Sequence, residues 1–273
     1  MEQQYPTQLI RFDADVRRET MSLKAVIDAI KADEAEAAVL DITSAQESHA
    51  WYDDEGFTSS PFTRNAHHSG TVATAVTMGQ LQREQKERLV AKAGEYFSIA
   101  ARINDDLRRT KYVRLFAQAL DARPLTMDGL YPYEFLIATR RIYDPHDEPF
   151  NFAPHCDDIT YARDLDNWPM RQQYPKQMGT FLTTQSAEND AGFVMWDCRP
   201  ASRAVLDRMH AEYREAGSIA ELERSARFVI RPKQGQLTVF KSKNIHAIER
   251  CSSRRLTVGM FLVEHKDGWR FFD

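Results

Sequence analysis

Two stretches of this sequence carry side chains that could bind a metal ion. The segment NFAPHCDDIT (151–160) places His155 and Asp157 two positions apart, and His246 follows 91 positions after His155 (246 − 155). Two imidazoles and one carboxylate would occupy three coordination positions of a metal ion and leave three open. That arrangement suits an Fe(II) ion that must bind a cosubstrate and O₂ together. We therefore predict that these three residues form both the metal site and the catalytic centre.

A second pair of residues could hold an anionic cosubstrate. Arg255 and Thr257 lie two positions apart in a segment with a strand pattern, so their side chains are expected on one face of the strand. A guanidinium binds a carboxylate through two parallel charge-assisted hydrogen bonds, and the hydroxyl adds a third donor. Arg254 is the alternative, because a register shift of one residue turns every side chain to the other face. We favour Arg255, because the residue two positions after Arg254 is Leu256, which has no polar group.

These residues require a scaffold of strands. Residues 130–273 are predicted to form short strands separated by turns, with one helix inserted at 201–217. Many short strands at close spacing are typical of a sandwich or barrel. In residues 1–129 helical patterns dominate; a strand is predicted within AAVLDIT (37–43) and a loop at 59–70. We expect one α+β domain over 1–273, with a mainly helical part (1–129) and a jelly-roll core (130–273).

Composition narrows the class of partner. The chain has 273 residues, a formal net charge of −4 and a pI near 6.1, so nothing in its electrostatics favours nucleic acid or an anionic membrane. A small-molecule substrate fits better. Three scattered cysteines indicate reduced thiols, and no apolar run has the length of a signal peptide or membrane span. We predict a cytoplasmic protein, and a homodimer is compatible with the sequence.

The order of the motifs resembles the Fe(II)/2-oxoglutarate-dependent oxygenase superfamily: H-x-D, then G-x-L-x-x-F before a histidine, then R-x-T. The resemblance covers roughly residues 130 to 265, and the ordered set is more specific than any single motif. It implies a double-stranded β-helix core, also described as jelly-roll or cupin-like. It also implies that His155, Asp157 and His246 bind Fe(II), that Arg255 and Thr257 bind 2-oxoglutarate, and that O₂ is consumed with release of succinate and CO₂.

The same resemblance suggests the type of reaction. We expect hydroxylation of an unactivated C–H bond in a small molecule, either a free amino acid or a natural-product intermediate. Halogenating relatives have glycine or alanine at the position of Asp157, so this chain is not expected to halogenate. Asp158 resembles an acidic residue that contacts the substrate amine in some of these enzymes. Arg141 and Trp168 are further candidates for substrate binding, although the sequence does not show whether Arg141 or its neighbour Arg140 faces the substrate.

Two other classes of function use similar residues. A cupin-like metal-dependent isomerase or hydrolase could use the same three ligands, but it would not need Arg255 and Thr257 at their spacing. A non-enzymatic jelly-roll binding protein would bind no iron and would not turn over 2-oxoglutarate. Formation of succinate distinguishes the oxygenase from both alternatives.

Overall fold

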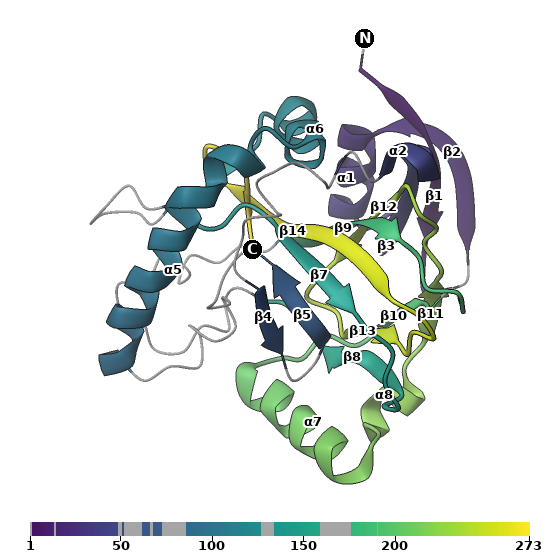
Figure 1. Cartoon of the computed structure of the whole chain (residues 1–273). Helices are drawn as coiled ribbons and strands as arrows, with labels where there is room; N and C mark the ends of the chain where they lie inside the picture. The colour runs from purple at the N-terminus through teal and green to yellow at the C-terminus, as the bar shows by residue number, and fades with distance from the viewer. Residues whose placement is uncertain are drawn as a thin grey trace.

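The structure is a computed structural model that describes residues 2–13, 15–48, 51, 62–65, 68–72, 86–126, 134–158, 176–189 and 191–273. Two β-sheets pack face to face, and helices cover the outer face of each sheet (Figure 1). This layering gives three apolar clusters. One lies between the two sheets, and the other two lie between each sheet and the helices that cover it.

The larger sheet has 11 strands. They are β1 (Gln4–Ile10), β2 (Val16–Ser22), β3 (Ala37–Asp41), β4 (Phe62–Asn65), β5 (His68–Val72), β6 (Arg123–Pro124), β7 (Thr139–Tyr143), β9 (Gln177–Gln185), β12 (Gln236–Lys241), β14 (Arg255–His265) and β15 (Gly268–Phe272). Their order is β2-β1-β3-β12-β9-β14-β7-β5-β4, and β15 pairs with both β14 and β6. All pairs are antiparallel except β15 with β6.

The smaller sheet has four strands, in the order β11-β10-β13-β8. They are β8 (Phe150–His155), β10 (Phe193–Trp196), β11 (Arg227–Ile230) and β13 (His246–Glu249). Phe193 on its inner face meets Phe181 and Phe240 of the larger sheet, with ring centroids 5.5 and 4.6 Å away. Buried aromatic side chains contribute strongly to a core. These ring contacts therefore help to hold the two sheets together.

The helices cover the outer faces of the sheets. Within the described residues they are α1 (Leu23–Lys31), α2 (Ala45–Ser48), α5 (Lys86–Leu107), α6 (Lys111–Leu120), α7 (Arg203–Ala216) and α8 (Ala220–Arg224). The hydroxyl of Ser22 caps α1 by accepting from the Ala25 amide, and α7 ends at Gly217 with a φ of 70°, which glycine adopts without strain. Apolar residues of α1, α5 and α6 pack on the larger sheet, and those of α7 on the smaller one. No helix of the described part of the chain is long and apolar enough to cross a membrane.

The α+β class is confirmed, and the predicted strands after residue 130 are present. In the N-terminal part the strand predicted within 37–43 is present as β3. The rest differs from the prediction, because β1, β2, β4 and β5 also join the larger sheet, and β4 with part of β5 lies in the predicted loop at 59–70. In β2 the first five residues are all exposed, so no alternation of apolar and polar residues marks it as a strand. Pairing with β1 stabilises it, and such pairing is a tertiary effect that overrides local propensity.

Candidate active site

The three predicted metal ligands come together at one end of the smaller sheet. His155 ends β8 and His246 begins β13, and the two are directly opposite in this antiparallel pair. Asp157 lies just beyond the end of β8, where its main-chain amide donates to the Ser242 carbonyl at 2.9 Å and its own carbonyl accepts from Gln177 Nε2 at 2.6 Å. Its Oδ2 is 3.6 Å from His155 Nε2 and 3.1 Å from His246 Nε2. The three ligand atoms all lie within 4.8 Å of one another.

The orientation of the two imidazoles fits a cation. Nδ1 of His155 lies 2.8 Å from the Ala153 carbonyl, and Nδ1 of His246 lies 2.9 Å from the Asn244 carbonyl. When each Nδ1–H donates to its carbonyl, each Nε2 presents a lone pair toward the Asp157 carboxylate. Lone pairs facing a carboxylate repel it unless a proton or a metal cation lies between them. A main-chain carbonyl that accepts from the other ring nitrogen is also the usual support of a metal-ligating histidine.

The charge states of the site also suit a divalent metal. Burial alone would raise the pKa of the Asp157 carboxyl, but the adjacent His155 and His246 hold this pKa well below its usual value. Burial lowers the pKa of His155, and the nearby His246 lowers it further. At neutral pH Asp157 is therefore ionised and His155 is neutral, which are the protonation states that bind metals.

Aromatic side chains surround this cluster. The Phe152 ring stacks on His155 with a centroid distance of 3.8 Å, and Phe240 and Phe193 lie 4.9 and 5.5 Å from the His246 ring. An apolar shell of this kind limits water access and strengthens electrostatic interactions inside it.

The Arg255 side chain is buried between the sheets with only 1% of the residue exposed. Its Nη1 donates to the Ala191 carbonyl at 2.9 Å, whereas Nη2 is buried and has no hydrogen-bond partner among the described residues. The guanidinium lies over the rings of Tyr143 and Phe181, 5.9 and 5.6 Å from their centroids. A buried donor without an acceptor costs stability, and more so on a charged group. A carboxylate would satisfy Nη2, so this site fits an anionic cosubstrate.

The strand register separates Arg255 from Arg254. The Arg254 side chain is 59% exposed, and its Nε donates to Asp144 Oδ1 at 2.7 Å on the protein surface. Thr257 is buried on β14 with Arg255, and its nearest partners across the sheet are Arg141 on β7 and Thr183 on β9. Arg255 and Thr257 thus lie in the buried interior and Arg254 lies outside it.

The predicted substrate residues have different surroundings. Arg141 is partly buried opposite Thr257, with Nη2 3.5 Å from Asp273 Oδ2. Asp158 is buried, and its carboxylate lies 3.3 Å from Lys243 Nζ, with side chains 5% and 7% exposed. Contact between Asp158 and a substrate amine stays a prediction. Trp168 lies outside the described residues.

Three residues around the site were not predicted from the sequence: Gln177, Lys243 and Asp273. Gln177 and Lys243 contact the segment that carries Asp157, and Asp273 contacts Arg141. Each comes from an element distant in sequence, so no local pattern marks it.

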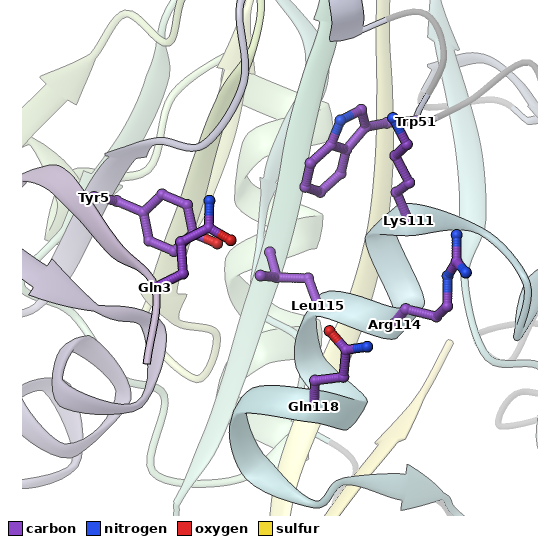
Figure 2. A pocket seen from close by; sticks show the side chains of 7 residues that line it. All are labelled: Gln3, Tyr5, Trp51, Lys111, Arg114, Leu115 and Gln118. Carbon is purple, nitrogen blue, oxygen red and sulfur yellow. The ribbon is translucent and has the colours of Figure 1, made fainter. Parts of the chain in front are cut away.

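A groove on another part of the molecule is unrelated to this cluster (Figure 2). It lies between β1 and α6, and its lining includes Tyr5, Trp51, Lys111 and Arg114. None of its lining residues belongs to the strands that carry the histidines. The chemistry described above therefore does not extend to this groove.

Neither a protein-family model nor a curated protein sequence matches the chain. Many solved structures match the chain, and two of them at 56% identity cover its full length. One is the crystal structure of a novel N-substituted L-amino acid dioxygenase from Burkholderia ambifaria AMMD, with 56% identity, 100% of both chains covered and a TM-score of 0.88. The other is that dioxygenase in complex with alpha-KG, which is 2-oxoglutarate, with 56% identity, 100% of both chains covered and a TM-score of 0.87. This chain therefore belongs to the Fe(II)/2-oxoglutarate-dependent oxygenase superfamily and is a dioxygenase whose cofactors are Fe(II), 2-oxoglutarate and O₂.

Proposed function

We propose that this dioxygenase oxidises an unactivated C–H bond of an N-substituted L-amino acid and converts 2-oxoglutarate to succinate and CO₂. The observation that carries the proposal is the 56% identity, over the whole of both chains, to a dioxygenase described as acting on that class of substrate. Family membership alone indicates the reaction but not the substrate, so the substrate class is the part that requires testing.

The proposal assigns a role to each of the residues predicted to bind the metal and the cosubstrate. His155, Asp157 and His246 hold Fe(II), and Arg255 with Thr257 binds the distal carboxylate of 2-oxoglutarate. The bound metal with 2-oxoglutarate and O₂ supplies the oxidising chemistry, and the chain orients the substrate and excludes water. Because Asp157 takes one coordination position, chloride has no vacant place there, and hydroxylation is expected rather than halogenation. We infer further that the two facing sheets form a double-stranded β-helix.

The carboxylates that the structure describes near the site support a substrate whose nitrogen carries no charge. Asp157 contacts both histidines, Asp158 pairs with Lys243, and Asp273 pairs with Arg141. A free amino acid presents an ammonium group, and an ammonium that leaves water needs an anionic partner. Each of these three carboxylates already has a partner. An N-acyl group removes the positive charge, so an N-acylated amino acid avoids the cost of burying an ammonium.

The experiment measures 2-oxoglutarate-dependent succinate release with Fe(II) and ascorbate. L-valine, L-leucine, L-isoleucine, L-methionine and L-phenylalanine are compared as free acids and as N-acetyl and N-methyl derivatives. We expect succinate release with N-acetyl acids to be at least about tenfold faster than with free acids. Burying the ammonium of a free acid without an anionic partner should cost roughly 1.4 kcal/mol or more, which corresponds to a factor of about ten. His246→Ala serves as the inactive control. Faster turnover of the free acids would contradict the proposed substrate class.

The cytoplasmic location and a homodimer remain predictions from the sequence. Light scattering of the purified protein measures its mass in solution, and cell fractionation tests the location. A monomer at micromolar concentration would contradict the homodimer without affecting the proposed reaction.

A further inference from the structure

Asp273 is fixed in place by contacts with two other parts of the chain. Its main-chain amide donates to the Leu136 carbonyl at 2.7 Å, and its main-chain oxygen accepts from the Tyr96 hydroxyl at 2.6 Å. Its Oδ2 accepts from the Thr139 hydroxyl and lies 3.5 Å from Arg141 Nη2. The Asp273 side chain is 12% exposed. The carboxylate is thus held at one end of β7, directed toward Arg141.

Arg141 lies further toward the metal ligands than Arg255 does. Arg141 pairs with Thr257 on β14, two positions nearer than Arg255 to Val263, and the β9 partner of Val263 is Gln177, which contacts the Asp157 carbonyl. The Arg141 side chain is 22% exposed, so a molecule entering from solvent can reach it, unlike the fully enclosed Arg255.

The contacts that Arg141 makes with the described residues leave one edge of its guanidinium available. Among the described residues, its side-chain hydrogen bond is the one from Nη2 to Asp273. The guanidinium lies 5.9 Å from the Phe261 ring centroid. Next to it on β14, Gly259 has no side chain, and a Cβ there would lie 3.9 Å from Arg141 Nη1. The planar fork of an arginine can bind one carboxylate on each edge.

Matching the carboxylates of the cosubstrate and the substrate to the cationic groups of the site indicates what the available edge of the Arg141 guanidinium binds. In the proposed function Arg255 would hold one carboxylate of 2-oxoglutarate, and the keto acid end with the other carboxylate would bind the metal held by His155, Asp157 and His246. Arg141 then has no anionic partner from the cosubstrate. An N-substituted L-amino acid keeps its α-carboxylate as an anion whatever group is on its nitrogen, and a carboxylate leaving water needs a cation.

We propose that Arg141 binds the α-carboxylate of the substrate and that Asp273 is a positioning residue that holds the Arg141 guanidinium in place for it. This inference rests on the proposed function. An arginine side chain loses considerable rotamer freedom when it binds a ligand. Asp273 restricts that freedom before the substrate arrives, so less of the binding energy is lost to ordering the side chain.

The test compares Asp273, which pairs with Arg141 on β7, with Asp144, which pairs with Arg254 just before the start of β14. Asp273→Asn keeps the side-chain size and the acceptor for Thr139, and Asp144→Asn removes the exposed partner of Arg254. The probes are N-acetyl-L-isoleucine and its carboxamide, with KM and kcat measured from succinate release. We expect Asp273→Asn to raise KM for the acid about tenfold with little change in kcat or in KM for 2-oxoglutarate, as a loss of preorganisation predicts. Asp144→Asn should change none of these values.

Arg141→Met supplies the second part of the test. It should raise KM for the acid roughly 100-fold, as loss of a partner in a buried charge pair predicts, and should abolish the preference for the acid over the carboxamide. If Asp273 acts through Arg141, adding Asp273→Asn to Arg141→Met should raise KM no further, because coupled residues are not additive.

Three results would overturn the inference. A lower melting temperature of Asp273→Asn with unchanged KM would show a structural role only. A raised KM for 2-oxoglutarate in the Arg141 or Asp273 variants would assign Arg141 to the cosubstrate. Additive effects in the double variant would show that Asp273 does not act through Arg141. If the unmodified enzyme oxidised no N-acetyl acid, the proposed substrate class itself would fail, which is distinct from an effect confined to the variants.

Discussion

His155 and His246 lie directly opposite each other in the β8–β13 pair, with ring centroids 4.3 Å apart, although 91 positions separate them in the sequence (246 − 155). An irregularity follows immediately, because the register shifts between His246 and Ile248. A shift of one residue would turn one imidazole to the outer face of the sheet. The proposed metal centre therefore depends on how two strands pair as much as on the residues themselves.

The first prediction concerns the metal ligands. With anaerobic Fe(II) and 2-oxoglutarate, the unmodified protein should show the weak visible charge-transfer band that superfamily membership implies for a chelated keto acid. His246→Ala removes one of three protein ligands, so the band should disappear. His146→Ala, on the loop between β7 and β8, is the control and should keep it. A band of unchanged intensity in His246→Ala would refute the assignment.

The second prediction concerns metal removal. A metal that binds the folded but not the unfolded chain should stabilise the fold by about 2.7 kcal/mol at 100 times its dissociation constant. Differential scanning fluorimetry with Co(II), and then with a chelator, measures the shift in melting temperature. Asp157→Ala removes the carboxylate ligand and should abolish the shift. The ligand assignment is wrong if this variant is stabilised by the metal as much as the unmodified protein.

The third prediction concerns the cosubstrate. Arg255→Ala should raise KM for 2-oxoglutarate at least tenfold, because truncating one partner of a buried, hydrogen-bonded charge pair costs about 2–5 kcal/mol. Arg254→Ala removes only an exposed ion pair with Asp144, so its KM should hardly change, since such pairs contribute about 0–1 kcal/mol. Titration of 2-oxoglutarate at saturating substrate gives both values. A raised KM in Arg254→Ala with an unchanged KM in Arg255→Ala would mean that the side-chain orientation at the start of β14 is wrong.

The fourth prediction concerns the buried pair next to Asp157. Lys243→Met removes the ammonium that pairs with the Asp158 carboxylate, and both side chains are less than a tenth exposed. Loss of one partner should lower the free energy of unfolding by about 3–5 kcal/mol, whereas Lys243→Met with Asp158→Leu should recover much of it. Urea unfolding measures both. If the double variant were as unstable as the single one, the pair would not explain the stability of this segment.

The spacing of residues was sufficient to identify the metal and cosubstrate candidates. Side chains two positions apart share a face of a strand whatever lies beside that strand, so the R-x-T pattern placed Arg255 and Thr257 on one side. The H-x-D pattern likewise named His155 and Asp157, although the structure ends β8 at His155 and positions Asp157 by contacts with Ser242 and Gln177. Membership of the superfamily, predicted from these motifs, is confirmed.

Tertiary structure decided which chemically equivalent residues lie inside. Arg254 and Arg255 are identical in type and adjacent in sequence, and only the pairing of β14 with β7 and β9 buries one of them. The contacts of Asp158 with Lys243 and of Asp273 with Arg141 span 85 and 132 positions (243 − 158 and 273 − 141). Local propensity and periodicity act over a few residues, whereas these pairs arise from the packing of distant strands, so no pattern in the sequence contains them.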